Sequence, residues 1–73
     1  MMKFSNEDRI ALLKQAIKAE EKRVKHLGIF LDNLELNTDI NITVSLELET
    51  QIFFIESKIE ELKNKLLELQ ESN

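Results

Sequence analysis

Residues 48–69, LETQIFFIESKIEELKNKLLEL, decide the fold. Apolar residues recur in this stretch at alternating spacings of four and three, the heptad pattern of a helix that buries one stripe against another helix. A second ladder of the same kind lies upstream, and Glu20 is its only polar member. The apolar members of the two ladders are Ile10, Leu13, Ile17, Val24, Leu27, Leu31 and Leu34, and Leu48, Ile52, Ile55, Ile59, Leu62, Leu66 and Leu69.

The two ladders mirror each other about the middle of the chain. When Leu31 is paired with Leu48, Ile10 with Leu69, and the other members in order between them, the two residue numbers of every pair add up to the same value. An antiparallel pair of helices requires this, because each step up one helix is a step down the other. We therefore predict an all-α fold, a coiled-coil-like antiparallel two-helix hairpin that forms a single domain over residues 1–73.

The first helix is expected over residues 6–36. Ser5 is a good N-cap, and Asp8 can return a hydrogen bond to it in a capping box. Gly28 follows the basic turn at Lys25, which is typical of a helix C-terminus. Because the heptad register continues past Gly28, we favour a continuous helix, in which this glycine costs about 1 kcal/mol relative to alanine.

A loop is expected over residues 37–43, followed by a second helix over residues 44–70 that Thr43 or Ser45 caps. Apolar and polar residues alternate over residues 40–48, which is the period of a half-buried strand. A short β-hairpin near the turn is the alternative, although an isolated two-stranded ribbon is marginally stable.

Composition limits the classes of function. The 73 residues include no cysteine or proline and a single glycine, and the net charge is −4. These counts exclude disulfides and thiolate metal sites and favour long helices. No apolar run approaches the roughly 20 residues of a membrane span, and the N-terminus has no apolar core like that of a signal peptide. We expect a soluble cytoplasmic protein that binds neither membranes nor nucleic acid, since phosphate binding needs an excess of Lys and Arg.

Charge and apolar residues are unevenly distributed. Residues 28–56 contain no Lys or Arg, and their acidic residues are Asp32, Glu35, Asp39, Glu47, Glu49 and Glu56. The same half of the chain holds most of the large apolar residues that the seam between two helices does not use. Exposed apolar surface of this extent is unusual in a monomer. We therefore expect two hairpins to form a homodimeric four-helix bundle, or one hairpin to dock on another protein.

The acidic, apolar tip of the hairpin is the candidate interface. Aromatic and aliphatic side chains beside carboxylates suit a hydrophobic contact steered by a basic target surface. The predicted interface residues are Phe30, Ile42, Leu46, Glu47, Glu49, Phe53 and Phe54. The expected function is stoichiometric binding of another protein. A purely structural homo-oligomerisation module is the alternative.

We find no sequence pattern for catalysis, a cofactor or a metal site, and we expect no enzyme activity. Glu20 lies in the seam opposite Ile59, where a carboxylate needs a partner such as Lys58 or Lys63. His26 is the only histidine, and we expect it on the solvated outer surface of the first helix.

Two resemblances bear on function. Residues 45–49, SLELE, resemble the Ser-x-x-x-Asp motif of the two-helix aspartyl-phosphate phosphatases that act on sporulation response regulators, with Glu49 in place of the Asp. That resemblance implies a phosphatase-like regulator and covers five residues. In composition, the chain is similar to small acidic helical proteins of phages and mobile elements that bind and inhibit a host protein.

Overall fold

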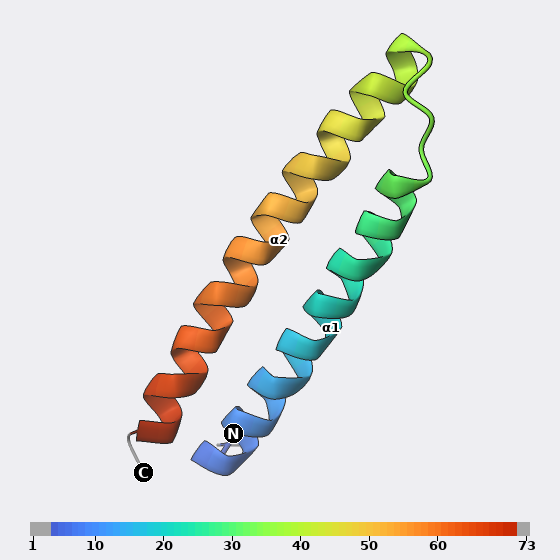
Figure 1. The fold of residues 1–73 in the computed structure, drawn as a ribbon. Helices are drawn as coiled ribbons and strands as arrows, with labels where there is room; N and C mark the ends of the chain where they lie inside the picture. The colour runs from blue at the N-terminus through green and yellow to red at the C-terminus, as the bar shows by residue number, and fades with distance from the viewer. Residues whose placement is uncertain (1–3, 72–73) are drawn as a thin grey trace.

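The computed structural model describes residues 4–71, which form two long helices joined by a short loop. Helix α1 spans Asn6–Asp32 and helix α2 spans Asp39–Glu71. The helices lie side by side in opposite directions, so the loop forms one end of the molecule, and the start of α1 and the end of α2 lie at the other (Figure 1). We call these ends the tip and the base. The predicted all-α hairpin is confirmed.

The start of α1 follows the prediction. The backbone N–H of Asp8 donates to the Ser5 hydroxyl at 3.1 Å, and the Asp8 carboxylate accepts from the Ser5 N–H at 3.4 Å. This capping box satisfies donors that a helix N-terminus otherwise leaves free. The helix continues through Gly28, as expected, and nothing lies within 4 Å of the place where a Cβ would stand.

The predicted end of α1 at Leu36 is wrong, because the helix ends at Asp32. Asn33 ends it by donating both its backbone N–H and its side-chain amide to the Ile29 carbonyl, at 3.2 and 2.8 Å. An asparagine side chain that bonds nearby backbone competes with the next helical turn. The loop therefore covers residues 33–38 instead of 37–43.

The predicted start of α2 is also wrong. The backbone N–H of Asn41 donates to the Thr38 hydroxyl at 3.1 Å, so Thr38 caps the helix where we expected Thr43 or Ser45. The Asn41 side chain closes the loop by donating to the Glu35 carbonyl at 2.7 Å. Thr43 lies inside the helix and donates to the Asp39 carbonyl.

The alternating run over residues 40–48 is helical, and the described part of the chain contains no strand. A helix satisfies its backbone hydrogen bonds within one segment, whereas a two-stranded ribbon here would have no third element to pack on. Within the run, Val44, Ser45 and Leu48 turn toward α1, while Ile40, at 75% exposure, and Leu46, at 60%, face outward.

The core lies along the predicted seam. Ile17, Ile55 and Ile59 are buried, and four half-buried residues pack against them, namely Val24, Leu27, Leu62 and Leu66. Every other apolar member of the two ladders is half-buried as well. The seam is therefore confirmed, but a core with so few buried side chains leaves most of each helix uncovered.

Candidate protein-binding surface

The seam divides the surface of the hairpin into two flanks. In an antiparallel pair, the residues that precede the seam positions on both helices share one flank, and those that follow share the other. Lys63 and Glu21, whose Nζ and Oε2 atoms are 3.6 Å apart, bridge one flank. A groove lined by Arg9 and Ala16 from α1 and by Lys65 from α2 marks the opposite flank. We call this second flank the groove face.

An apolar stripe follows the tip half of α2 on the flank of Lys63. Ile42, Leu46, Glu49 and Phe53 recur at spacings of four, three and four, so their side chains line one side of the helix. All four are exposed, Leu46 to 60% and Phe53 to 65%. We refer to these four residues as the α2 stripe.

The other three predicted interface residues, Phe30, Glu47 and Phe54, belong to the groove face. Phe30 and Phe54 are exposed to 57% and 64%, and both precede seam positions. The rings of Phe53 and Phe54 meet edge to face, with centroids 5.8 Å apart and planes at 70°. The seven predicted residues are therefore all exposed in the tip half of the hairpin, but they are divided between two flanks. The two flanks meet on the outside of α2 at this aromatic pair.

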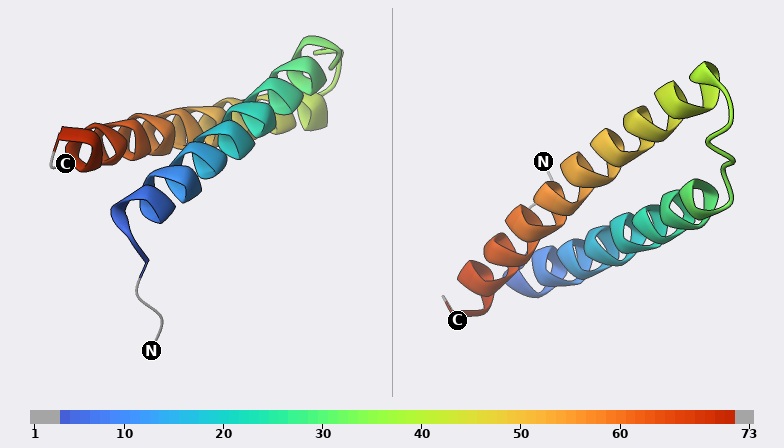
Figure 2. Two further views of the ribbon diagram at one scale, coloured as in Figure 1. Left: turned by 90° about the horizontal axis from the view of Figure 1, so that it is seen from below. Right: turned by 45° about the horizontal axis from the view of Figure 1, so that its top comes forward.

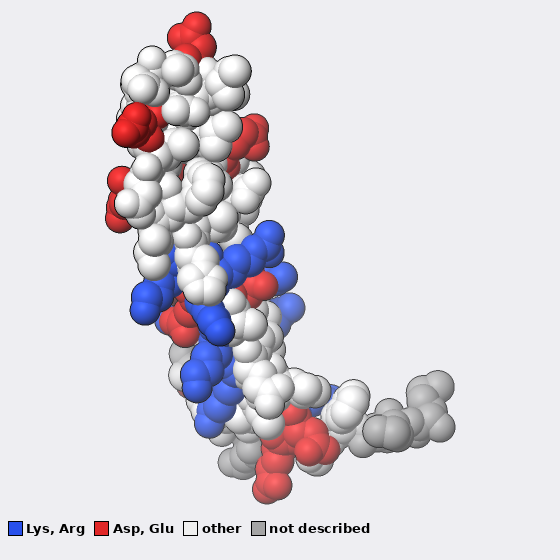
Figure 3. Space-filling view, turned by 90° about the vertical axis from the view of Figure 1, so that its right-hand side faces the viewer, with Lys and Arg blue, Asp and Glu red and all other residues white. Residues whose placement is uncertain are grey.

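The electrostatic character of the tip follows from the absence of Lys and Arg in residues 28–56. Figure 3 shows acidic side chains without basic ones toward the tip, and Lys and Arg gathered across the middle of the molecule. A protein that approaches the tip therefore meets a negative potential, which attracts a basic surface and falls off within about 10 Å at moderate salt.

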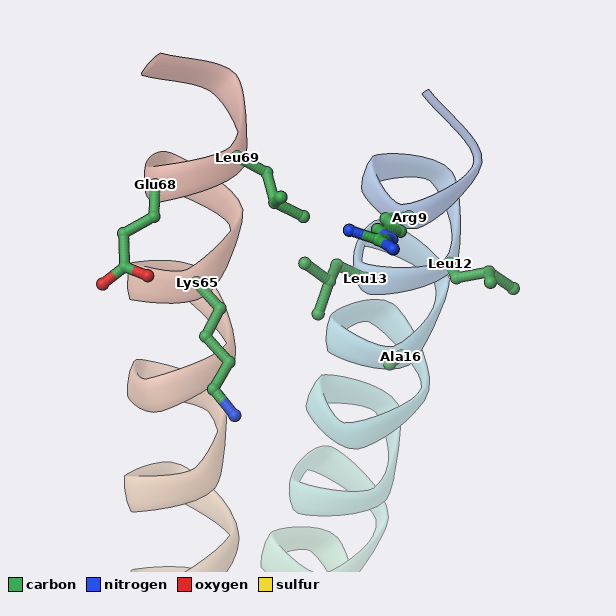
Figure 4. Close-up of a pocket in the computed structure, with 7 residues that line it drawn as sticks. All are labelled: Arg9, Leu12, Leu13, Ala16, Lys65, Glu68 and Leu69. Carbon is green, nitrogen blue, oxygen red and sulfur yellow. The ribbon is translucent and has the colours of Figure 1, made fainter. Parts of the chain in front are cut away.

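The groove at the base is a feature that sequence reasoning missed. It has a volume of about 620 Å³ and is lined by Arg9, Leu12, Leu13, Ala16, Lys65, Glu68 and Leu69. The groove lies at the end where the two helices separate, as the left view of Figure 2 shows. Leu13 and Leu69 point toward each other across it (Figure 4). The outward Leu12 and Ala16 indicated apolar surface here, but a heptad pattern does not report how far helices diverge.

The centre of the seam is polar. Glu20 packs among the buried isoleucines with 17% of its side chain exposed, and its Oε1 atom is 3.9 Å from the Nζ of Lys58. The Oε2 atom is buried and has no hydrogen-bond partner. Of the two lysines that we predicted as partners of Glu20, the structure pairs Lys58 with it. Lys63 pairs with Glu21 instead.

The residues weighed for chemistry are dispersed. Ser45 is buried at 7% exposure and faces α1, whereas Glu49 is exposed on the α2 stripe, so the two ends of the SLELE motif do not share a surface. His26 is exposed, as predicted. Among residues 4–71, no group of three or more His, Asp or Glu side chains is placed to hold a metal ion. Neither described helix is long and apolar enough to cross a membrane.

The fold and surface together define an α-helical hairpin with exposed apolar flanks. The chain matches no protein-family model, and no significant match to it is found among curated proteins or solved structures.

Proposed function

We propose that this chain is a non-enzymatic protein-binding module that acts stoichiometrically, with the α2 stripe as the surface that contacts its target. The observation that carries the proposal is the exposure of Ile42, Leu46 and Phe53 on one side of one helix, beside Glu49. The target would be a protein with a complementary basic surface.

The spacing of the stripe matches a known mode of recognition. Helices that bind protein grooves present anchors on successive turns of one side, and large aromatic anchors contribute most of the affinity. Ile42 and Leu46 lie on successive turns of α2, and Phe53 lies two turns beyond Leu46 on the same side. Glu49 lies between the anchors and, with the other tip carboxylates, would raise the association rate with a basic target more than the affinity.

Self-association is the second candidate function, and a separate observation favours it. Among residues 4–71, the buried apolar residues are Ile17, Ile55 and Ile59, while Phe30, Phe54 and Leu12 on the groove face are half exposed or more. A four-helix bundle of two hairpins would cover such surface. In this alternative, the chain is a purely structural module whose exposed apolar surface is covered by a second copy.

The α2 stripe is tested by affinity capture from cells that express the protein, followed by binding measurements with the purified target. Phe53→Asp and Leu46→Asp should each weaken binding at least tenfold, because a carboxylate would replace a buried anchor. Leu67→Asp is the matched control. Leu67 lies on the same flank of α2 at the base and is 53% exposed, so this variant should bind as the wild type does.

Two results would contradict the proposal. One is a target that binds the Phe53→Asp and wild-type chains equally well. The other is a loss of binding in the Leu67→Asp control as large as that in Phe53→Asp, which would indicate general damage to the fold. Inhibition of the target, the action that the compositional similarity to phage proteins suggests, is part of the proposal. It is tested by the activity of the purified target with and without one equivalent of the chain.

A further inference from the structure

We propose that the groove face binds a second copy of this chain, with the tip of each hairpin lying over the base of the other. This inference rests on the self-association proposed above and adds its surface and its orientation. The occupant of the groove at the base is then the phenylalanine pair, Phe30 and Phe54, of the second copy.

The positions of groove and phenylalanines along the hairpin support this arrangement. Glu20 and Ile59 form the middle layer of the seam. Phe30 follows Glu20 by ten residues on α1, and Leu12 precedes it by eight. On α2, Phe54 precedes Ile59 by five residues and Lys65 follows it by six. A twofold axis that lies in the contact plane at this layer, perpendicular to the long axis of the hairpin, reverses the second copy end to end. It therefore places each phenylalanine of one copy over the groove of the other.

The shapes at the two ends of the face are complementary. In its tip half, the face carries two exposed aromatic rings, and at the base it has a groove with a mainly apolar lining. Near the middle, Ala16 and Ala19 are small, so two copies of α1 can approach closely there. A twofold contact of this kind uses the same surface on both copies and closes, so it produces a dimer and no filament.

Charge favours the tip-over-base orientation over the opposite one. A tip-to-tip dimer would bring together two halves that have acidic residues and no Lys or Arg. The tip-over-base dimer separates these halves and sets each near Arg9 and Lys65, which line the groove with a single carboxylate, Glu68. Lys58 lies near the axis in both copies, and Glu20 beside it offsets that charge.

The face is large enough for a stable dimer. The hairpin measures 53 × 20 × 19 Å, and a standard interface takes about 800 Å² from each partner. The α2 stripe stays outside this contact, so one dimer would present two copies of the stripe to other proteins.

Molecular mass in solution tests the surface. We expect the purified wild-type chain to be a dimer at micromolar concentration, and Phe30→Asp and Leu12→Asp, at opposite ends of the face, each to shift it at least tenfold toward monomer. Leu67→Asp is the matched control, since Leu67 is 53% exposed on the opposite flank of α2 and lies outside the proposed contact, and it should stay a dimer. Far-UV circular dichroism on each variant verifies that the helices remain.

Cross-linking tests the orientation, and the natural chain has no cysteine to interfere. Ala19→Cys lies near the proposed axis, so oxidation should join two chains through this residue. Ala11→Cys, also exposed on α1 but outside the groove face, should stay unlinked.

A monomeric wild type would overturn the proposal. So would a dimer that Phe30→Asp and Leu12→Asp leave intact, or one that Leu67→Asp disrupts as strongly as they do. A dimer in which Ala19→Cys fails to cross-link would overturn the orientation. These measurements use the chain alone, so their outcome does not depend on whether the α2 stripe binds a target.

Discussion

Gly28 lowers the intrinsic stability of α1 without ending the helix. The sequence before it resembles a helix C-terminus, yet α1 continues to Asp32. The heptad register on both sides was the better guide, because burial of Val24, Leu27 and Leu31 stabilises the helix beyond this point. Local propensity is a weak prior that tertiary packing overrides.

Replacement of this glycine should raise stability. A Cβ at Gly28 meets nothing within 4 Å, and alanine loses less backbone entropy on folding. We expect Gly28→Ala to increase the free energy of unfolding by about 1 kcal/mol, measured by urea denaturation. Ala19→Gly, at an exposed site on the same helix, should decrease it by a similar amount. No gain in Gly28→Ala would indicate that α1 bends at this residue in solution.

We expect Glu20 to lower the free energy of unfolding relative to an apolar residue at the same position. Its buried Oε2 has no partner, and its Oε1 lies 3.9 Å from an exposed lysine. Glu20→Leu would extend the apolar cluster across the middle layer, and we expect it to raise the free energy of unfolding by about 1–4 kcal/mol. Thermal denaturation measures this change. Glu21→Leu is the exposed control and should give no gain. A less stable Glu20→Leu chain would mean that the Lys58 contact contributes more than its burial costs.

At the scale of the elements, the seam could be predicted but the two helix ends at the tip could not. Burial follows the heptad pattern, whereas helix ends depend on a few side-chain hydrogen bonds. Residues 33–41 offer several polar side chains that can cap a helix, and the sequence does not rank them. The structure selects Asn33 and Thr38, so α2 includes the run over residues 40–48 that alternates like a strand.

The Thr38 cap predicts an effect confined to the start of α2. Thr38→Ala removes the acceptor of the Asn41 N–H, and we expect it to lower the free energy of unfolding by about 0.5–2 kcal/mol. Amide hydrogen exchange should become faster over residues 39–42. Thr43→Ala is the control, because its hydroxyl only donates to a carbonyl that the helix already uses. Equal effects of the two changes would argue against a cap at Thr38.

At the scale of the whole molecule, the sequence indicated exposed apolar surface near the tip but not its division between two flanks. The seven predicted interface residues are all apolar or acidic, and they come from the same region of the sequence. The side of the seam on which each one lies depends on its position within the heptad. The groove at the base could not be predicted from the sequence, because a heptad pattern does not give the distance between the helices there.

Dimer formation makes stability depend on concentration. If two hairpins fold as one bundle, the midpoint of thermal unfolding should rise by several degrees between about 1 and 100 µM chain, because association favours the folded state by mass action. Scanning calorimetry at several concentrations measures this shift. The Phe30→Asp chain should show a lower midpoint with little dependence on concentration. A midpoint that is independent of concentration in the wild type would contradict a folded dimer.

The short loop over residues 33–38 also sets the order in which the two helices come together. Leu31 and Leu48 are close in sequence, whereas Ile10 and Leu69 enclose nearly the whole chain, so contact at the tip has the smaller loop-closure entropy. Folding should therefore begin at the tip and proceed toward the base, like a zipper. Stopped-flow φ-values would then be high for Leu31→Ala and Leu48→Ala and low for Leu13→Ala and Leu66→Ala. Shortening the loop would accelerate folding, while substitutions at the base would mainly accelerate unfolding.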